Sequence, residues 1–286
     1  MVPRSYPTGL RLGILATMTE GSGAGTMTAM GGGGLRLLLA AELAATVVFG
    51  LWPYLAPAEF AQTFGLRGDE PYLYRLAGAA IFGYATAAVV GLVRDGRPGL
   101  RIPLAALLTF GLTAIVGGLA TIDETGVQPL SVVLVIGGGL FAAAAALQLW
   151  RAAAVSGIAG DRLEPGLRLT LAGATVAATL FAGWQLLLPR AFASFFGLSA
   201  ADLVIIRLTG AATLGYALAG LLATAVDRWP AARIQTFPSI SANILAAIAS
   251  AIYIAQGGRS LLGPLFLLAS GLLVLSLTAW AARAER

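Results

Sequence analysis

The chain has 286 residues, of which 58% are hydrophobic and 11% are charged, and its net charge is +5. Soluble domains carry roughly 25% charged residues, so a water-soluble fold of this length would lack polar surface, and lipid is the solvent that fits. All 18 basic residues are Arg, and the chain contains no Lys, His or Cys. This composition excludes imidazole bases and ligands, thiol nucleophiles, Lys Schiff bases and Cys-ligated clusters. We therefore expect no metal and no cofactor.

The positive charge does not predict nucleic-acid binding. The Arg residues fall in short segments between apolar runs, which is the distribution that membrane topology produces. No basic stripe is interleaved with aromatic residues, as nucleic-acid binding would require. We expect the lipid bilayer to be the main partner.

Residues 1–33 are rich in Gly, Thr and Met and end in a run of four glycines at 31–34. The apolar stretch near Leu10 is too short for a signal-peptide core. We interpret this segment as a disordered cytoplasmic tail. An over-extended gene start is the alternative, with Met18, Met27 or Met30 in place of Met1 as the true beginning.

Eight later segments have the length and apolar character of bilayer-crossing helices, which need about 20 residues. Their long runs of Ala, Leu, Val and Ile do not alternate as barrel strands do. The expected spans are 35–56, 73–93, 102–122, 130–150, 167–188, 204–225, 235–255 and 261–281.

The segment 34–92 recurs at 166–224 with no gap, at a constant offset of 132 residues, and 25 of the 59 aligned pairs are identical. Apolar bias can match Ala and Leu, but it does not place Arg, Trp, Pro and Tyr in register. We therefore expect a tandem duplication. Residues 34–151 are called the first repeat, 152–165 the cytoplasmic linker and 166–286 the second repeat.

The distribution of Arg predicts the orientation of the spans. Thirteen of the 18 Arg residues lie on the side of the two termini, which the positive-inside rule assigns to the cytoplasm. Four spans per repeat is an even number, so both repeats would insert the same way up. The expected fold is all-α and polytopic, with eight transmembrane helices as two parallel four-helix repeats. Their pseudo-two-fold axis would run along the membrane normal, and the chain would reside in the cell (inner) membrane.

Each repeat carries a Pro-x-x-Phe-x-x-x-Phe-Gly motif after its first span, at residues 57–65 and 189–197. Proline opens a helix well, glycine closes one, and Phe residues four apart share a face. The motif predicts a short amphipathic helix at the outer interface, acting as an anchor or, alternatively, as a lid over a pocket.

The second span of each repeat carries small residues spaced by four. This helix-packing stripe comprises Ala79, Gly83, Ala87 and Gly91 in the first repeat and Ala211, Gly215 and Ala219 in the second. Helices in lipid associate over small residues, so we expect a helix–helix contact. Its partner would be the first span of the same repeat or the matching helix of the other repeat.

Arg75 and Arg207 begin the two stripes at their outer ends. The structural interpretation is that each Arg bonds helix-end carbonyls or a carboxylate such as Asp69, Glu70 or Asp202. The functional interpretation is that a guanidinium fork recognises an anionic ligand or lipid headgroup. Duplication favours the structural role, because a single site rarely needs both.

Four further polar residues lie at membrane depth and complete the candidate ligand site: Glu42, Tyr84, Tyr216 and Asn243. A carboxylate in hydrocarbon is costly and marks function by default, although Glu42 could instead be an interfacial residue paired with Arg36, Arg94 or Arg101. Tyr84 is expected at a depth similar to that of Glu42, which would permit a hydrogen bond. The alternative for the hydroxyls and the amide is ordinary interhelical hydrogen bonding.

The residues Phe64-Gly65-Leu66, Arg75-Leu76-x-Gly78 and Gly83-Tyr84 resemble the small four-helix bacterial membrane proteins of the DoxX-like group. Members of that group are usually one four-helix unit, so the resemblance implies a fused equivalent of a dimer. It also implies a membrane subunit role, since some members accompany quinone-coupled sulfur oxidation. The absence of Cys, His and cofactor motifs gives no support for a redox role here.

Three functional hypotheses follow. The first is a non-catalytic membrane subunit or scaffold whose stripes dock another membrane protein, with no stable polar cavity between the repeats. The second is a transporter or a protein that binds lipid or a small anionic molecule, with a cleft between the repeats reached by the candidate site residues. The third, an intramembrane enzyme, is the least favoured because acid–base chemistry would rest on Glu42 and tyrosines alone.

Overall fold

The computed structural model describes residues 30–93, 100–151 and 161–284. Most of the predicted tail and of the predicted linker lies outside these ranges, as do Arg94 and Arg97. Residues 30–33, which were expected to belong to the tail, are helical and form the first turn of α1. Glycine lowers helix propensity by about 1 kcal/mol but does not block the hydrogen bonds of a helix, so the polyglycine run can extend it.

Ten helices make up the described part of the chain, with these bounds: α1 Met30–Leu55, α2 Pro57–Thr63, α3 Pro71–Val93, α4 Arg101–Thr125, α5 Pro129–Arg151, α6 Pro165–Leu187, α7 Pro189–Phe195, α8 Leu203–Val226, α9 Trp229–Ala255 and α10 Leu262–Ala284. Within these ranges, eight helices are long and apolar enough to cross a membrane, and they correspond to the eight predicted spans. The largest shift is in α9, which begins six residues before its predicted start because Pro230 occupies its first turn, where a missing N–H costs nothing.

The chain is therefore an integral, multi-pass membrane protein with an all-α fold. Large apolar side chains on its outer helices face outward. Leu140, Leu180 and Leu268 are each more than two-thirds exposed. Exposed apolar surface on this scale is unfavourable in water and is satisfied by lipid acyl chains.

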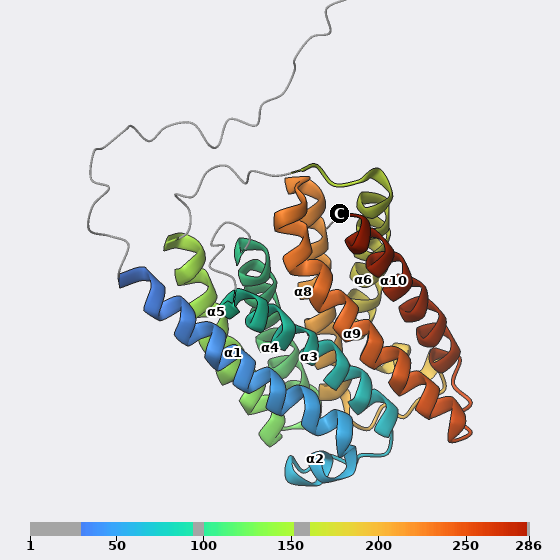
Figure 1. Ribbon diagram of the computed structural model, residues 1–286. Helices are drawn as coiled ribbons and strands as arrows, with labels where there is room; N and C mark the ends of the chain where they lie inside the picture. The colour runs from blue at the N-terminus through green and yellow to red at the C-terminus, as the bar shows by residue number, and fades with distance from the viewer. Residues whose placement is uncertain (1–29, 94–99, 152–160, 285–286) are drawn as a thin grey trace, which may run out of the picture.

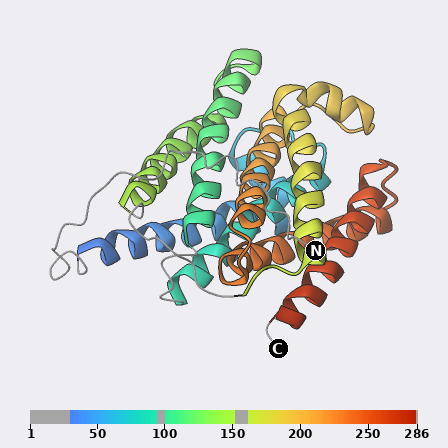
Figure 2. The same cartoon turned by 90° about the horizontal axis from the view of Figure 1, so that it is seen from above.

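The eight long helices form two rows of four. In one row α1 packs on α3, α3 on α9, and α9 on α10, and Figure 1 shows these helices side by side on the near face. In the other row α6 packs on α8, α8 on α4, and α4 on α5. Each row thus combines two helices of the first repeat with two of the second, and α5 and α10 lie at opposite edges of the molecule (Figure 2).

The central helices are α3 and α8, and the peripheral ones are α6 and α10. Of the most apolar stretch of each helix, 78% is buried in α8 and only 17% in α6 and α10. The second span of each repeat therefore holds the two rows together, and the sixth and tenth helices are the ones most open to lipid.

The predicted short helices are present as α2 and α7, with matching aromatic contacts. The ring of Trp52 meets Phe60 edge-on at 5.4 Å, and Trp184 meets Phe192 edge-on at 5.5 Å. Both helices end in a glycine of positive φ, Gly65 at 66° and Gly197 at 64°, a conformation that residues with a Cβ rarely adopt. Because Phe60 and Phe192 are fully buried, these helices are packed parts of the core.

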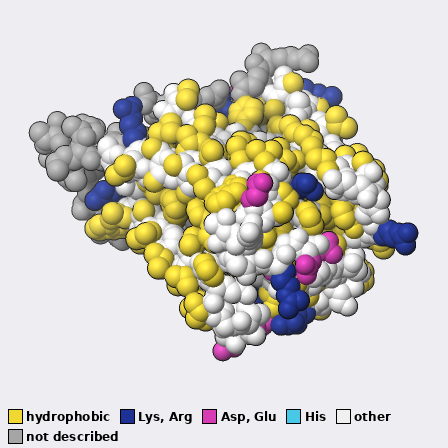
Figure 3. Space-filling model, turned by 90° about the horizontal axis from the view of Figure 1, so that it is seen from below, with side chains coloured by type: hydrophobic (Ala, Val, Ile, Leu, Met, Phe, Trp, Pro, Cys, Tyr) yellow, Lys and Arg dark blue, Asp and Glu magenta, His cyan; other side chains and the backbone are white. Residues whose placement is uncertain are grey.

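The loops that follow α2 and α7 are joined by reciprocal hydrogen bonds, which we call the loop clamp. Asp202 accepts hydrogen bonds from the backbone N–H groups of Arg67 and Gly68, both at 2.9 Å, and from the Tyr74 hydroxyl at 2.7 Å. In return, Glu70 accepts one from the backbone N–H of Ser199 at 3.0 Å. Asp202 and Glu70 occupy matching positions of the two repeats. Charged side chains gather in small groups at this end of the molecule, on a largely apolar surface (Figure 3).

We expect Asp202→Ala to lower the free energy of unfolding by at least about 3 kcal/mol, because it removes three hydrogen bonds to a charged group, which contribute about 1.5–3 kcal/mol each. Thermal unfolding of the purified protein in detergent, followed by circular dichroism, measures the loss. Asp69→Ala is the matched control: Asp69 is exposed in the same loop as Arg67, and its loss should cost under about 0.5 kcal/mol. Equal stability of the two variants would contradict the clamp.

Candidate functional site

The six predicted site residues do not converge on one cleft. The structure places five of them in three surroundings: a tyrosine pair between α3 and α8, a buried carboxyl on α1, and two arginines at the end of the molecule that carries α2. A separate cavity takes in two of the six.

Tyr84 and Tyr216 form a reciprocal pair at the centre of the molecule. The Tyr84 hydroxyl donates to the Ala212 carbonyl oxygen, the Tyr216 hydroxyl donates to the Ala80 carbonyl oxygen, and both distances are 2.9 Å. Their ring centroids lie 4.9 Å apart. The hydrogen bond expected between Tyr84 and Glu42 is not formed, because the Tyr84 hydroxyl is directed to α8.

The glycines of the stripe make this pair possible. A Cβ on Gly83 would overlap the Tyr216 hydroxyl, and a Cβ on Gly215 would overlap that of Tyr84. Each glycine therefore leaves room for the tyrosine of the other repeat. Both partners expected for the stripe are in contact with it. Gly83 and Gly215 lie against the matching helix, together with α9 and α4, and Gly91 lies against Leu39 of the first span of the same repeat. Gly78, next to the stripe, also contacts that first span.

Glu42 is enclosed by protein, with 2% of its surface exposed. Its Oε1 has no hydrogen-bond partner among the described residues. Such burial does not fit the expectation of an interfacial residue. Glu42 holds the position in the first repeat that Ala174 holds in the second.

Arg207 is 3% exposed and binds α4 of the first repeat. It donates to the Thr121 hydroxyl at 3.0 Å and forms an ion pair with Glu124. The carboxylates predicted for this role were Asp69, Glu70 and Asp202, because the sequence does not reveal that α4 lies beside α8. Arg75 is only partly buried, and the neutral Gln256 stands where Glu124 would be matched in the second repeat.

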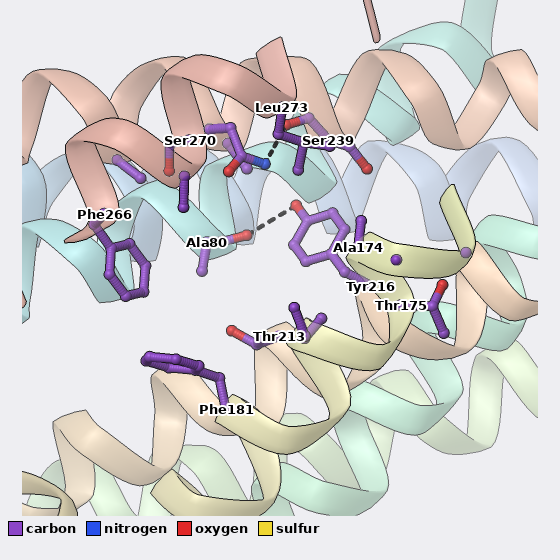
Figure 4. A pocket seen from close by; sticks show the side chains of 18 of the residues that line it. Ala80, Ala174, Thr175, Phe181, Thr213, Tyr216, Ser239, Phe266, Ser270 and Leu273 are labelled. Atoms are coloured by element: carbon purple, nitrogen blue, oxygen red, sulfur yellow. Dashed lines mark hydrogen bonds between the residues drawn. The ribbon is translucent and has the colours of Figure 1, made fainter. Parts of the chain in front are cut away.

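A cavity of about 560 Å³ lies among α6, α8, α9 and α10, with α3 of the first repeat in its wall. Figure 4 shows Phe181 and Phe266 facing each other toward one end and Tyr216 toward the other. Its polar lining side chains are neutral: Thr175, Gln185, Thr209, Thr213, Tyr216, Ser239, Asn243, Ser270 and Ser276. Among the described residues, no charged side chain lines it. The volume falls within the roughly 300–1,000 Å³ that small-molecule sites occupy.

Of the predicted site residues, Tyr216 and Asn243 line this cavity, and Glu42, Arg75, Tyr84 and Arg207 do not. Asn243 donates from Nδ2 to the Ser239 carbonyl oxygen at 2.8 Å. Its side-chain carbonyl oxygen makes no hydrogen bond within the described part of the chain, so it can accept one from a ligand.

The cavity forms in the second repeat because smaller side chains stand there. At the offset of 132 residues, Ser239 and Ala242 match Leu107 and Phe110 of the first repeat. Leu107 is fully buried, and the Phe110 ring stacks on Tyr84 at 5.1 Å. Gly111 and Gly138 also let α4 and α5 approach closely, whereas Asn243 and Ser270 replace them in α9 and α10.

Several lining residues were missed by sequence reasoning, among them Thr213, Phe181 and Phe266. Comparison of the two repeats beyond residue 92 could have located the cavity, since Ser239 and Ala242 replace larger residues in one repeat only. Within the described ranges, no group of three or more metal-ligating side chains is found.

No family model, no curated protein and no solved structure matches this chain. The resemblance to DoxX-like proteins therefore stays a prediction.

The two arginines give a matched test of their role. We expect Arg207→Met to lower the free energy of unfolding by about 2 kcal/mol, less than the roughly 3–5 kcal/mol for breaking a fully buried pair, because Glu124 is partly hydrated. Arg75→Met should cost less than about 0.5 kcal/mol. Thermal unfolding in detergent compares them, and equal losses would contradict the structural role of Arg207.

Proposed function

We propose that this protein binds an uncharged, largely apolar small molecule in the cavity of the second repeat. The observation that carries the proposal is the combination of a ligand-sized volume with an apolar lining and a few neutral polar groups. Recognition sites for small molecules have this composition. An anionic ligand is not favoured, because the arginines expected to bind it are directed elsewhere.

The scaffold hypothesis is supported less well. It expected no polar cavity between the repeats and assigned the stripes to a partner protein. Six of the seven stripe residues are buried within the chain itself, so they are not free to dock another protein. An enzymatic function has less support still, since Glu42 lies away from the cavity.

We expect Ala242→Phe to reduce ligand binding, since it introduces into the cavity wall the side chain that the first repeat carries at Phe110. The measurement is photolabelling of the protein in phosphatidylcholine nanodiscs by a long-chain alkane carrying a diazirine. Wild-type labelling should map to the residues lining the cavity and fall at least about fivefold in the variant.

The control for this variant is Ala279→Phe, which adds the same side chain to an exposed position of α10 outside the cavity. It should be labelled as the wild type is. Labelling spread evenly over the lipid-facing helices of the wild-type protein would contradict the proposed function.

We also propose that both chain ends lie in the cytoplasm and that the repeats arose by duplication, related by an axis along the membrane normal. The excess of Arg on that side and the matched helix contacts support this arrangement. In right-side-out vesicles, reporter tags at the two chain ends should be protected from protease, and a tag in the loop at Gly126 should be cleaved. Termini on opposite faces would contradict it.

A further inference from the structure

The cavity lies against α6 and α10, the two helices least covered by the rest of the protein. These helices touch near both ends: the rings of Phe181 and Phe266 meet edge-on at 5.6 Å, and Trp280 packs onto Gly166 at the other end.

Between these two contacts the cavity wall is exposed. Gly173 and Ala177 of α6 and Ala269 and Leu272 of α10 line the cavity and are also among the exposed residues of these helices. We call these four residues the window. Because the contacts lie near the helix ends, the window sits at the depth of the hydrocarbon core.

Gln185 provides a polar group in the cavity whose side-chain oxygen has no hydrogen-bond partner among the described residues. Its side chain is 2% exposed, it lines the cavity, and its Oε1 has no hydrogen-bond partner in the described part of the protein. A buried amide in a membrane protein costs free energy unless it is hydrogen-bonded. The first repeat carries Pro53 at this position, so the architecture of the repeat does not require an amide here.

The cavity is long enough for an extended chain. Leu171 and Gln185 both line it and are 14 residues apart on α6, which corresponds to about 21 Å at the helical rise. Its two ends differ: Gln185 lies two residues from the end of α6, whereas Leu171 lies among apolar neighbours.

We propose that a single-chain lipid with an uncharged hydroxyl-bearing headgroup, such as a monoacylglycerol, enters laterally through the window. Its headgroup hydrogen-bonds Gln185, and its chain extends along α6 toward Leu171. A charged headgroup would lose its hydration without gaining a counter-charge. The inference rests on the proposed function, of which it specifies the ligand class and the route.

The headgroup is tested with two probes in phosphatidylcholine nanodiscs: a monoacylglycerol with a diazirine in its chain and the alkane with the same diazirine. We expect Gln185→Leu to lower occupancy by the monoacylglycerol about fivefold, as for one lost hydrogen bond, and to leave alkane occupancy unchanged. Gln256→Leu, at an exposed glutamine after α9, is the control and should change neither. Equal occupancy of the wild type and Gln185→Leu by the monoacylglycerol would overturn the headgroup assignment.

The route is tested by the rate of labelling after the monoacylglycerol is supplied in donor vesicles. Ala177→Trp combined with Ala269→Trp should slow labelling at least tenfold. The same substitutions at the matching positions, Ala45→Trp with Gly137→Trp, should leave the rate unchanged. An unchanged rate in the window variant would overturn lateral entry.

If neither probe labels the cavity of the wild type, the proposed function fails. If both probes label it but Gln185→Leu and the window variant have no effect, only the present inference fails.

Discussion

The arrangement of the helices depends on the close approach of α3 and α8 at two glycines. Gly83 and Gly215 each lie against the hydroxyl of the other repeat's tyrosine, and each hydroxyl reaches a backbone carbonyl oxygen 2.9 Å away. In hydrocarbon there is no hydrophobic force between helices, so close packing and interhelical hydrogen bonds must supply the association. The same contact brings α4 to α8 and α9 to α3, which is why each row of helices combines both repeats.

The symmetric core carries an asymmetric periphery. The tyrosine pair and the aromatic clusters of α2 and α7 are alike in the two repeats, and each repeat contributes one carboxylate to the loop clamp. Farther from the centre, Leu107 and Phe110 fill the first repeat, and Ser239 and Ala242 leave the second one hollow. The proposed duplication would supply two equivalent sites, of which one remains packed for stability while the other is opened. A large-to-small replacement in a core costs about 2–5 kcal/mol, a loss that a bound ligand can offset.

Periodicity and composition predicted the fold well, because span length and apolar content are set by the bilayer. All eight spans, both short helices and the buried stripe were read from sequence. The pairing of α4 with α8 and of α3 with α9 was not, since nothing in the sequence distinguishes a partner within a repeat from one in the other repeat. Of the residues predicted for a ligand site, Tyr216 and Asn243 line the cavity, whereas Glu42 and Arg207 were selected for their charge at membrane depth and do not. A charged side chain at membrane depth costs free energy. For Arg207 this cost is offset by the ion pair with Glu124, which forms only because the tertiary structure places α4 beside α8.

The location of the cavity follows from the same constraint. Because α3 and α8 meet at the centre, α1 and α5 are left at one edge and α6 and α10 at the other, each packed mainly on a single neighbour. The cavity lies at the second of these edges. A gap between two central helices would leave unpacked space inside the protein. A gap between two edge helices is instead filled by lipid. Small residues on α6, together with aromatic contacts near its two ends, keep this gap from closing. The geometry that stabilises the centre thus places the accessible cavity at the lipid boundary, where an apolar ligand is most concentrated.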